Sequence, residues 1–471
     1  MKKSEYQKYF AGKKITVMGL GLLGRGLGDA KFLAEMGAEL IVTDLKTAEQ
    51  LKTSVDSLNK FVSSRRKVGT PTETSGLKPI TYHLGSHDLK DFQNRDLILK
   101  AAGVPLDSIY IAEARKNNIP VKMSTSWFAK IAMDYGVKIV GITGTRGKST
   151  VTQLIYEILQ GAQGQSLKTQ NPRTVLGRDP EIFLGGNVRG VSTLPLLKKL
   201  KKGDVVVMEL DSWQLQGFGD EKISPSVAVF TTFYPDHLNY YKGDLSAYYA
   251  DKAKIYTHQK KGDILIVGEQ VEQINRGLPS VVLPKNWKLK IPGEHNRYNA
   301  GLALATARAL NISEKVIKKA VESFKGVSGR LEFIKNWKGR KIYNDTTSTT
   351  PEATLVALKA LSKNKNTVLI MGGADKTLDM TKLVEALPRY CKKVILLPGT
   401  GTDKIMNQGL TLGLGFLRRD LKNMEEAISE AVKVSKKGDV ILLSPAFASF
   451  GLFKNEFDRG EQFNKLVKKL K

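Results

Sequence analysis

The sequence predicts an α/β protein of three domains, and three observations support this prediction. Short apolar stretches typical of buried strands alternate with helical patterns along the chain, which favours mainly parallel sheets. Glycine-rich turns follow two of these stretches, at residues 19–24 and 144–147. The chain has 471 residues, which exceeds one ordinary domain and suits two or three.

Each domain has its own strand pattern. We expect a Rossmann-like domain at residues 1–125, a central ATPase domain of the P-loop type with a mainly parallel sheet at 126–327, and a Rossmann-like α/β domain at 328–471. The second boundary precedes a new strand pattern in "SGRLEFIKNWKGRKIYND". Residues 54–78 are polar and contain Gly and Pro, so we expect a mobile insertion there.

Composition narrows the class of protein. The sequence contains no run of eighteen apolar residues, so we expect no membrane span. The first residues lack the apolar core of a signal peptide. Cys391 is the only cysteine, so no intrachain disulfide is possible and a reducing, cytoplasmic compartment fits. Lys and Arg total 74 against 46 Asp and Glu, a net charge of +28. No basic stretch is interleaved with aromatic residues, so a lysine-rich solvated surface is a better interpretation than a nucleic-acid site.

The first glycine turn has the form of a dinucleotide or nucleotide-sugar site. Gly19, Gly21 and Gly24 stand at G-x-G-x-x-G spacing after an apolar stretch, and Asp44 ends the next one. Such glycines let the backbone and a helix N-terminus approach a diphosphate. The pattern alone fits NAD, whose ribose Asp44 would bind, as well as UDP.

The second turn, "GITGTRGKST", has the form of a phosphate-binding loop. The strict P-loop pattern requires glycine at position 142, where Ile142 stands. Lys148 can still reach a terminal phosphate, and Ser149 or Thr150 can hold Mg²⁺. The helical spacing of Val151, Leu154, Ile155, Ile158 and Leu159 places a helix N-terminus behind the phosphates. The residues expected around ATP in this loop are Gly144, Thr145, Gly147, Lys148, Ser149 and Thr150.

This variant loop resembles that of the Mur ligase and folylpolyglutamate synthetase superfamily, whose members are ATP-dependent ligases that join an amino acid to a carboxylate. Further motifs similar to those of the family follow in order and cover most of the chain. They are "GGN" at 185–187, "ELDSWQLQ" at 209–216, "PDHLNYYKGDLSAYYADKAKIY" at 235–256, "GEHNRYNAGLALA" at 293–305, "GRLEF" at 329–333 and "YNDTTSTTPEAT" at 343–354.

The resemblance implies roles for residues in these motifs. Magnesium or manganese would be held by Ser149, Glu209, His237 and Lys252, with Lys252 carbamylated. ATP would also contact Asn296, Asn299, Arg330 and Asp345, and catalysis would depend on Lys148, His237, Lys252 and Arg330. Other interpretations are a salt bridge at the end of a strand for Glu209, a structural role for His237 and a helix surface for Lys252.

The C-terminal stretch "LLSPAFASFGLFKNEFDRGEQF" at 442–463 resembles the Mur ligases that add D-glutamate. "GGADK" at 372–376 supports this resemblance. It implies that Lys376 and Thr349 bind the α-carboxylate of D-glutamate, with Ser449 at its side-chain carboxylate and Phe457 beside it. Ser449 could instead cap a helix. The nucleotide-sugar substrate, UDP-N-acetylmuramoyl-L-alanine, would contact Gly21, Leu22, Leu23, Asp44, Asn187 and His237.

Several positions depart from the common pattern of the D-glutamate ligases. Thr347 stands where a lysine is common near the amino-acid site, and Leu23 stands where a threonine often contacts the diphosphate. Gly329 and Glu456 replace a histidine and a phenylalanine. None of these changes removes a catalytic group, and together they indicate a divergent lineage.

The function expected from the resemblance is ATP-dependent addition of D-glutamate to UDP-N-acetylmuramoyl-L-alanine, through an acyl phosphate, in peptidoglycan precursor synthesis. We expect a cytoplasmic monomer that needs ATP and Mg²⁺ or Mn²⁺, without nucleic acid or membrane insertion. The alternatives are a sister ligase for another amino acid, a folylpolyglutamate-like enzyme, a catalytically silent UDP-sugar-binding protein and a nicotinamide dehydrogenase.

Overall fold

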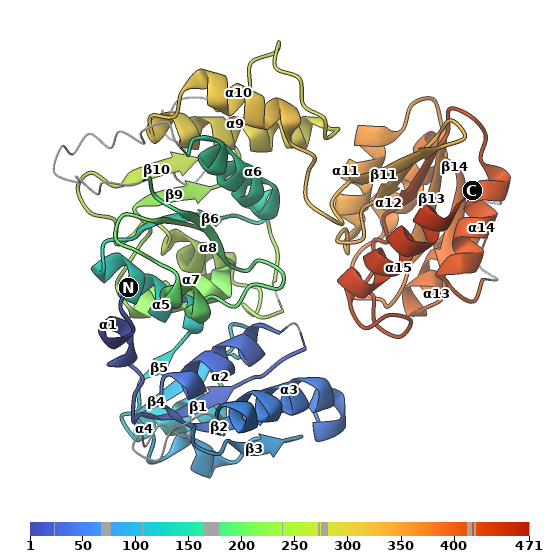
Figure 1. Cartoon of the computed structure of the whole chain (residues 1–471). Helices are drawn as coiled ribbons and strands as arrows, with labels where there is room; N and C mark the ends of the chain where they lie inside the picture. Colours follow the sequence, from blue (N-terminus) through green and yellow to red (C-terminus); the bar gives the residue numbers. More distant parts are fainter. Residues whose placement is uncertain are drawn as a thin grey trace. The chain divides into compact units, whose positions relative to one another are not determined.

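In a computed structural model the chain forms three sheets, one after another along the sequence, with helices between their strands (Figure 1). This confirms the predicted α/β class. The structure describes residues 1–22, 24–66, 77–105, 107–163, 179–237, 239–271, 274, 281–411, 417–418 and 421–470. The contacts divide the chain into two compact units, residues 1–282 with 299–317, and residues 283–298 with 318–471. The first unit holds two sheets, and the boundaries near 125 and 327 stay predictions.

The first sheet is Rossmann-like, with five parallel strands in the order β3-β2-β1-β4-β5. Its strands are β1 (Lys14–Met18), β2 (Glu39–Asp44), β3 (Thr81–Leu84), β4 (Leu97–Lys100) and β5 (Val121–Lys122). The strand order reverses between β1 and β4, and ligands of open α/β sheets bind at such a point, beyond the carboxyl ends of the strands. The first glycine turn and helix α2 (Arg25–Glu35) follow β1 there.

The expected insertion at residues 54–78 is wrong over its first half. Residues 48–66 form helix α3, which packs against α2, while residues 67–76 lie outside the described residues. Leu51, Leu58 and Val62 are buried at helical spacing. These three apolar positions, rather than the many polar residues around them, decide the structure, because one apolar stripe is enough to dock a surface helix.

The second sheet carries the phosphate-binding loop. It has five parallel strands in the order β10-β9-β6-β8-β7. Its strands are β6 (Lys138–Thr143), β7 (Ile182–Gly186), β8 (Val205–Glu209), β9 (Val227–Phe230) and β10 (Ile264–Val267). Helix α6 (Lys148–Gly161) packs on β6, β7 and β8, and all five of its predicted apolar positions are at most 2% exposed.

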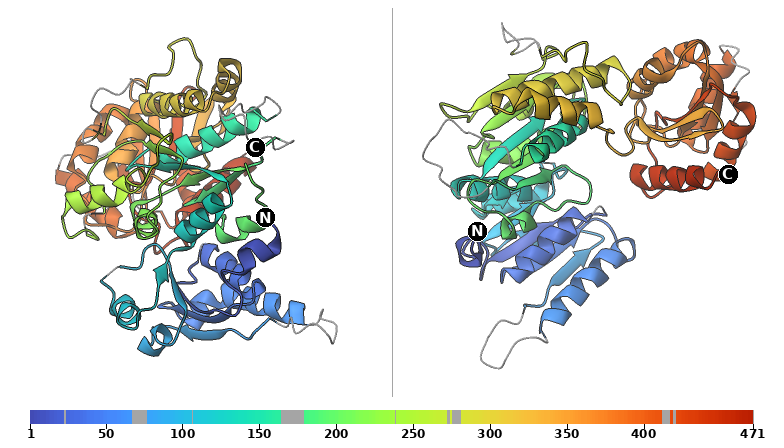
Figure 2. Two further views of the ribbon diagram at one scale, coloured as in Figure 1. Left: turned by 90° about the vertical axis from the view of Figure 1, so that its left-hand side faces the viewer. Right: turned by 45° about the horizontal axis from the view of Figure 1, so that its top comes forward.

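The third sheet forms the second unit and has the order β11-β12-β16-β13-β14-β15. Its strands are β11 (Glu332–Trp337), β12 (Arg340–Asn344), β13 (Thr367–Gly372), β14 (Cys391–Leu397), β15 (Leu417–Arg418) and β16 (Val440–Leu443). β11 and β12 pair antiparallel at one edge, and the remaining pairs are parallel. Alternate residues of β13 enter two separate cores, so helices cover both faces of this sheet (Figure 2).

The remaining helices connect and cover the sheets. In the first unit these are α1 (Lys3–Gln7), α4 (Ile109–Lys116), α5 (Ser124–Asp134), α7 (Ser212–Asp220) and α8 (Leu245–Ala253), with short 3₁₀ helices η1 (Leu89–Phe92) and η2 (Leu194–Lys198). Helices α9 (Glu294–Ala309) and α10 (Glu314–Ser323) contribute to both units. The second unit contains α11 (Pro351–Leu361), α12 (Thr381–Tyr390), α13 (Thr400–Thr411), α14 (Met424–Val434) and α15 (Glu456–Lys469). None of the helices in the described part of the chain is long and apolar enough to cross a membrane.

Candidate active site

The phosphate-binding loop joins β6 to α6 at the carboxyl edge of the central sheet. Gly147 is the N-cap of α6 with a φ of +86°, and a Cβ there would lie 2.4 Å from Asn299 Oδ1, so only glycine fits. The amide nitrogens of Thr145 and Arg146 each donate to Thr232, at 2.8 Å to its carbonyl and 2.8 Å to its hydroxyl. The loop is therefore held in place with the N-terminus of α6 available for an anion.

Two lysines converge on one carbonyl oxygen of this loop. Lys148 Nζ donates to the carbonyl of Gly144 at 2.9 Å and to that of Thr145 at 3.2 Å. Lys252 Nζ, from α8, donates to the same Gly144 oxygen at 2.8 Å. Ser149 and Thr150 occupy the first turn of α6, directly after Lys148. The structure thus brings together residues that are more than one hundred positions apart in the sequence.

Lys252 is almost completely buried, at 2% exposure, so its interpretation as a helix-surface lysine is wrong. Burial holds the pKa of Lys252 well below its usual range, and the neighbouring charge of Lys148 lowers this pKa further. This shift favours the neutral amine, which carries a free electron pair. A neutral buried amine beside a phosphate loop is a nucleophile or a ligand rather than a structural cation.

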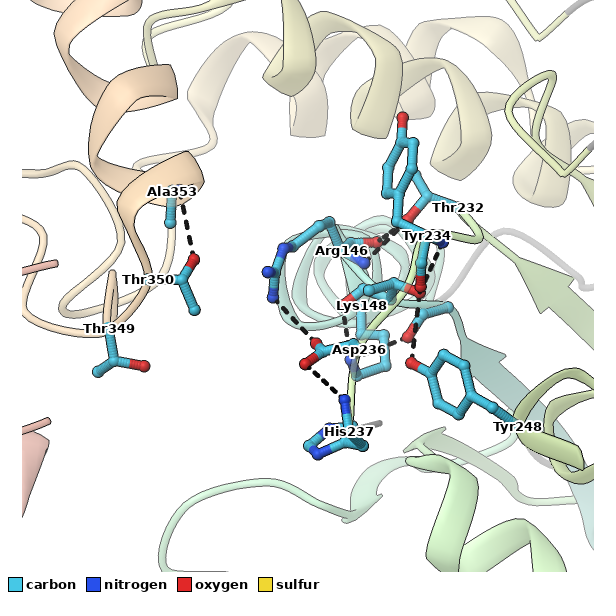
Figure 3. Close-up of polar contacts among 12 residues, drawn as sticks. Arg146, Lys148, Thr232, Tyr234, Asp236, His237, Tyr248, Thr349, Thr350 and Ala353 are labelled. Atoms are coloured by element: carbon cyan, nitrogen blue, oxygen red, sulfur yellow. Dashed lines mark hydrogen bonds and ion pairs between the residues drawn. The ribbon is translucent and has the colours of Figure 1, made fainter. Parts of the chain in front are cut away.

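His237 follows an aspartate that is fixed by the loop. Arg146 Nη1 pairs with Asp236 Oδ2 at 3.3 Å, and Asp236 Oδ1 accepts the backbone N–H of His237 at 2.9 Å (Figure 3). His237 has a φ of +53°, which is uncommon for a non-glycine residue, and its ring centroid lies 4.8 Å from that of Trp213. Burial lowers the pKa of His237, which favours the neutral imidazole that can bind a metal.

Glu209 ends β8 and is 5% exposed. Among the residues that the structure describes, its carboxylate has no hydrogen-bond or ion-pair partner, so the salt-bridge interpretation of Glu209 is wrong. A buried carboxylate without a counter-charge favours a cation. The oxygen and nitrogen donors predicted beside it, Ser149, His237 and Lys252, suit Mg²⁺ or Mn²⁺. Over the described ranges no group of three His, Cys, Asp or Glu side chains could hold a metal, so a site here needs the serine or the modified lysine.

A cavity of about 350 Å³ lies at the switch point of the first sheet. Its lining includes Gly19, Gly21, Leu22 and Asn187, which comes from the segment after β7. The predicted Asp44 lies outside the lining; its Oδ2 accepts the N–H of Gly21 at 3.0 Å and so holds the glycine turn. Of the other predicted substrate residues, Leu23 is not among the described residues, and His237 is outside the lining but contacts the lining residue Trp213.

In the second unit, Asp345 follows β12 as the centre of a buried network. It accepts hydrogen bonds from the Leu331 amide at 3.0 Å, from Ser348 Oγ at 2.6 Å and from Ser444 Oγ at 2.9 Å. Burial raises the pKa of Asp345 to about 6, although these bonds and the charge of Arg330 oppose the shift. Arg330 itself is exposed.

The two predicted asparagines lie three residues apart on α9. Asn299 contacts Gly147, as described above, and is 5% exposed. Asn296 Nδ2 donates to the carbonyl of Pro292 at 2.7 Å. Asn296 is therefore fixed by the turn before its own helix.

The residues predicted to bind the amino acid also come together in the second unit. Lys376 Nζ donates to Thr349 Oγ1 at 3.0 Å. Ser449 follows Ala448, which pairs with Ala374 in an isolated β-bridge, so the Ser449 and Lys376 segments lie side by side. Asn455, rather than Ser449, caps the following helix α15, so the helix-cap interpretation of Ser449 is wrong.

Two neighbouring positions complete this region. Phe457 lies in the first turn of α15, and its amide donates to the Asn455 side chain at 3.0 Å. Thr347, at the position that departs from the common lysine, donates its hydroxyl to the Gly329 carbonyl at 2.9 Å. Thr347 therefore stabilises the turn before Arg330.

Sequence reasoning missed Arg459, the largest fully buried side chain among the described residues. Its guanidinium donates to the carbonyl of Thr346 at 2.8 Å, to the hydroxyl of Thr346 at 3.1 Å and to the carbonyl of Phe447 at 3.3 Å. Arg459 thus holds the backbone beside Asp345. Burial lowers the pKa of Arg459 to about 10, so it keeps its charge at neutral pH. The sequence carries no signal for this role, because backbone acceptors have no sequence signature.

Comparisons with known proteins identify the family of this chain. Residues 142–281 match the Mur ligase middle domain, and residues 329–447 match the Mur ligase glutamate ligase domain. The UDP-N-acetylmuramoylalanine–D-glutamate ligase of Roseiflexus sp. (strain RS-1) is 32% identical, and the alignment covers 97% of this chain and 98% of that protein. The protein of the same name from Borreliella afzelii (strain PKo) is 34% identical, with 96% of each chain covered.

Solved structures show the same fold. The UDP-N-acetylmuramate–alanine ligase MurC of Thermotoga maritima has a TM-score of 0.59 at 18% identity, and covers 97% of this chain and 99% of its own. The MurF ligase of the same organism, in complex with ADP, has a TM-score of 0.54 at 16% identity, over 81% of this chain and 97% of its own. With curated relatives at 30% identity or more over nearly the whole chain, the protein belongs to the Mur ligase family.

Proposed function

We propose that this protein is an ATP-dependent ligase that joins D-glutamate to UDP-N-acetylmuramoyl-L-alanine in peptidoglycan precursor synthesis. The observation that carries the reaction type is the convergence of Lys148 and Lys252 on the Gly144 carbonyl, inside a loop at a helix N-terminus. The names of relatives that match over the full length supply the two substrates.

The chemistry explains why ATP is needed. Forming an amide directly from a carboxylate and an amine is unfavourable at neutral pH. Transfer of the γ-phosphoryl group of ATP to the L-alanyl carboxylate gives an acyl phosphate, and the amine of D-glutamate then displaces phosphate. Phosphoryl transfer requires positioned positive charge at the phosphate oxygens. Lys148 supplies this charge in the proposed complex, together with the N–H groups at the start of α6.

Two of the four predicted metal donors, Glu209 and Lys252, are buried, and the set suits a divalent cation. Ser149, Glu209, His237 and carbamylated Lys252 would hold Mg²⁺ or Mn²⁺, which when bound neutralises phosphate charge. The neutral Lys252 amine can attack carbon dioxide, forming an N–C bond and releasing one proton. The resulting carbamate replaces a buried amine by a negatively charged oxygen donor, which also suits the nearby Lys148.

The second unit is proposed to bind the amino acid. Lys376 and Thr349 would take the α-carboxylate, and Ser449 the side-chain carboxylate. The Ser449 hydroxyl makes no hydrogen bond within the described part of the chain, so it is available to a ligand. One cation with several neutral donors suits the two carboxylates of D-glutamate.

The testing experiment measures phosphate release from ATP with UDP-N-acetylmuramoyl-L-alanine and one amino acid at a time. D-Glutamate, L-glutamate, D-aspartate and L-lysine would be compared at equal concentration, with the product mass determined for each. We expect release and a ligated product with D-glutamate only. A product with another amino acid only would keep the ligase and replace its specificity. No release with any of them would favour a silent binding protein.

A further inference from the structure

Arg25 faces the cavity at the switch point of the first sheet, although no sequence motif points to it. It is the first residue of α2, and its side chain is among the cavity lining. Its Nη1 donates to Asn187 Oδ1 at 2.6 Å, from the segment after β7 of the central sheet. A cation of the first sheet therefore holds the asparagine that is proposed to contact the substrate.

Arg25 is held firmly by its surroundings. Ser192 Oγ donates to the carbonyl of Arg25 at 3.0 Å and to that of Gly24 at 3.3 Å. A Cβ on Gly28 would lie 2.0 Å from Ser192 Oγ, so glycine at this position permits the contact. The first turn of α2 is thus fixed against residues 187–192 by both its backbone and its first side chain. A positively charged group in such a position is pre-organised for a ligand.

The cavity also contains one carboxyl oxygen that lacks a partner within the described part of the chain. Asp29 lies one turn beyond Arg25 on α2, lines the same cavity and is 5% exposed. Its Oδ1 has no hydrogen-bond partner among the described residues. Burial raises the pKa of Asp29 to about 7, although hydrogen bonds with Ser124 and with the Leu194 backbone and the charge of Arg25 oppose this shift. An unpaired buried carboxyl oxygen favours a ligand that brings an O–H or N–H donor.

The guanidinium retains donors for an anionic ligand. Of its five N–H groups, only one is used by a protein acceptor within the described ranges. The cavity volume of about 350 Å³ suits part of a nucleotide rather than a lone ion. A cation, a glycine turn and an unpaired acceptor in one cavity match an anionic diphosphate joined to hydroxyl-bearing sugars.

We propose that Arg25 binds the diphosphate of the nucleoside-diphosphate sugar and at the same time orients Asn187, so that it determines affinity for the diphosphate. This inference rests on the proposed function and adds a residue that binds the negatively charged diphosphate of the substrate. Arg25 would bind the substrate and would take no part in phosphoryl transfer, unlike Lys148 and Lys252. Its removal should therefore affect one substrate and leave the others unchanged.

The experiment compares Arg25→Met, Arg25→Lys and a matched control, Lys31→Met, in the full chain. Lys31 lies on the same helix and carries the same charge, but its Nζ donates to Ser57 Oγ at 2.8 Å, and it is not part of the cavity lining. Calorimetry measures binding of UDP and of uridine, and kinetics measure KM for UDP-N-acetylmuramoyl-L-alanine, ATP and D-glutamate.

We expect Arg25→Met to weaken UDP binding by about 10- to 100-fold and uridine binding by less than about twofold, because a charge-assisted hydrogen bond to phosphate is lost. KM for the nucleotide sugar should rise by a similar factor, while KM for ATP and D-glutamate stays constant. Arg25→Lys should recover most of the UDP affinity, and Lys31→Met should match the wild type.

Equal weakening of UDP and uridine by Arg25→Met would overturn the inference, since it would indicate a purely structural role. Unchanged UDP binding would also overturn it. Either result leaves the proposed ligase intact as long as the wild type turns over its substrates. Failure of the wild-type chain to bind UDP or the nucleotide sugar would instead contradict the proposed function and the inference together.

Discussion

Two lysine sites in this protein use the same residue type in opposite environments. At the phosphate loop, Lys252 is buried, shares the Gly144 carbonyl with Lys148 and has a lowered pKa. At the proposed amino-acid site of the second unit, Lys376 is exposed and donates to the hydroxyl of Thr349. The first environment changes the chemistry of the amine, whereas the second leaves an exposed positive charge for recognition.

The comparison shows that burial distinguishes the reactive Lys252 from Lys376, which is proposed to bind the amino acid. Both lysines were selected by motif resemblance, so the motifs alone do not make this distinction. The positive charge of Lys148 lowers the pKa of Lys252, and either a neutral Lys252 amine or a bound anion relieves this repulsion. The phosphate loop is therefore poised for ATP and for modification of Lys252. The pair formed by Lys376 and Thr349 gains little without its ligand, because exposed polar contacts contribute little to stability.

The largest expected effect is at the phosphate loop. Lys148→Met should lower kcat on the order of 1,000-fold, since positive charge at the transferred phosphoryl group is lost. The measurement is phosphate release in the presence of all three substrates. Lys260→Met, which removes an exposed lysine of the same unit, serves as the control and should retain full activity. Comparable losses in both variants would show that Lys148 has no special role.

A second prediction separates Lys252 from Lys148. Lys252→Ala should lower activity on the order of 100-fold, as loss of a metal-binding group does. Wild-type activity should fall when carbon dioxide is removed and return with bicarbonate, and ¹³C-labelled bicarbonate should give a carbamate NMR signal that Lys252→Ala lacks. The lowered pKa of Lys252 favours the neutral amine that reacts with carbon dioxide, and acidification should protonate it and reduce the signal. A labelled signal of equal size in the alanine variant would refute carbamylation of this residue.

The recognition lysine should give a smaller and more selective effect. Lys376→Met should raise KM for D-glutamate by about 10- to 30-fold and leave KM for ATP within about twofold, because one charged contact to a carboxylate is lost. Lys382→Met, on the exposed surface of α12 in the same unit, is the matched control. If KM for ATP rose together with KM for D-glutamate, Lys376 would have a role other than amino-acid recognition.

The sequence was sufficient for most of the fold because the buried strands are continuous apolar stretches. The prediction failed at α3, which was expected to be part of a mobile insertion. Its many polar residues hid the three apolar positions that are buried in the structure. Short strands such as β5 were not found, since two residues carry no period. The glycine turns were found because positive φ values and close approaches leave only glycine, as at Gly147.

The candidate site was only partly accessible from the sequence. Motif resemblance selected Lys148, Lys252 and Glu209, but the shared Gly144 carbonyl and the absence of a partner for Glu209 among the described residues depend on tertiary structure. Arg25 and Arg459 were missed for a physical reason. Their acceptors are an asparagine 162 residues away and backbone carbonyls, and neither leaves a local pattern.

The smallest expected effect concerns the stability of the second unit and the Asp345 network. Its pKa of about 6 lies above the value of about 3.9 for an unfolded aspartate, so the folded state binds this proton more tightly. The stability that Asp345 contributes is therefore complete below about pH 4 and is lost as the pH rises through 6.

Asp345→Asn keeps the shape and remains neutral, so its unfolding free energy relative to the wild type should improve by about 1–2 kcal/mol between pH 4.5 and pH 7.5. Urea unfolding at both pH values measures this difference. Asp29 is present in both proteins, so its contribution to the pH dependence cancels. A constant difference between the two proteins across this range would show that Asp345 is already ionised in the folded state at pH 4.5. The hydrogen bonds of Asp345 would then stabilise its ionised carboxylate as strongly as water stabilises an exposed one. Asp345 would have an ordinary pKa despite its burial, in contrast to Lys252 at the phosphate-binding loop.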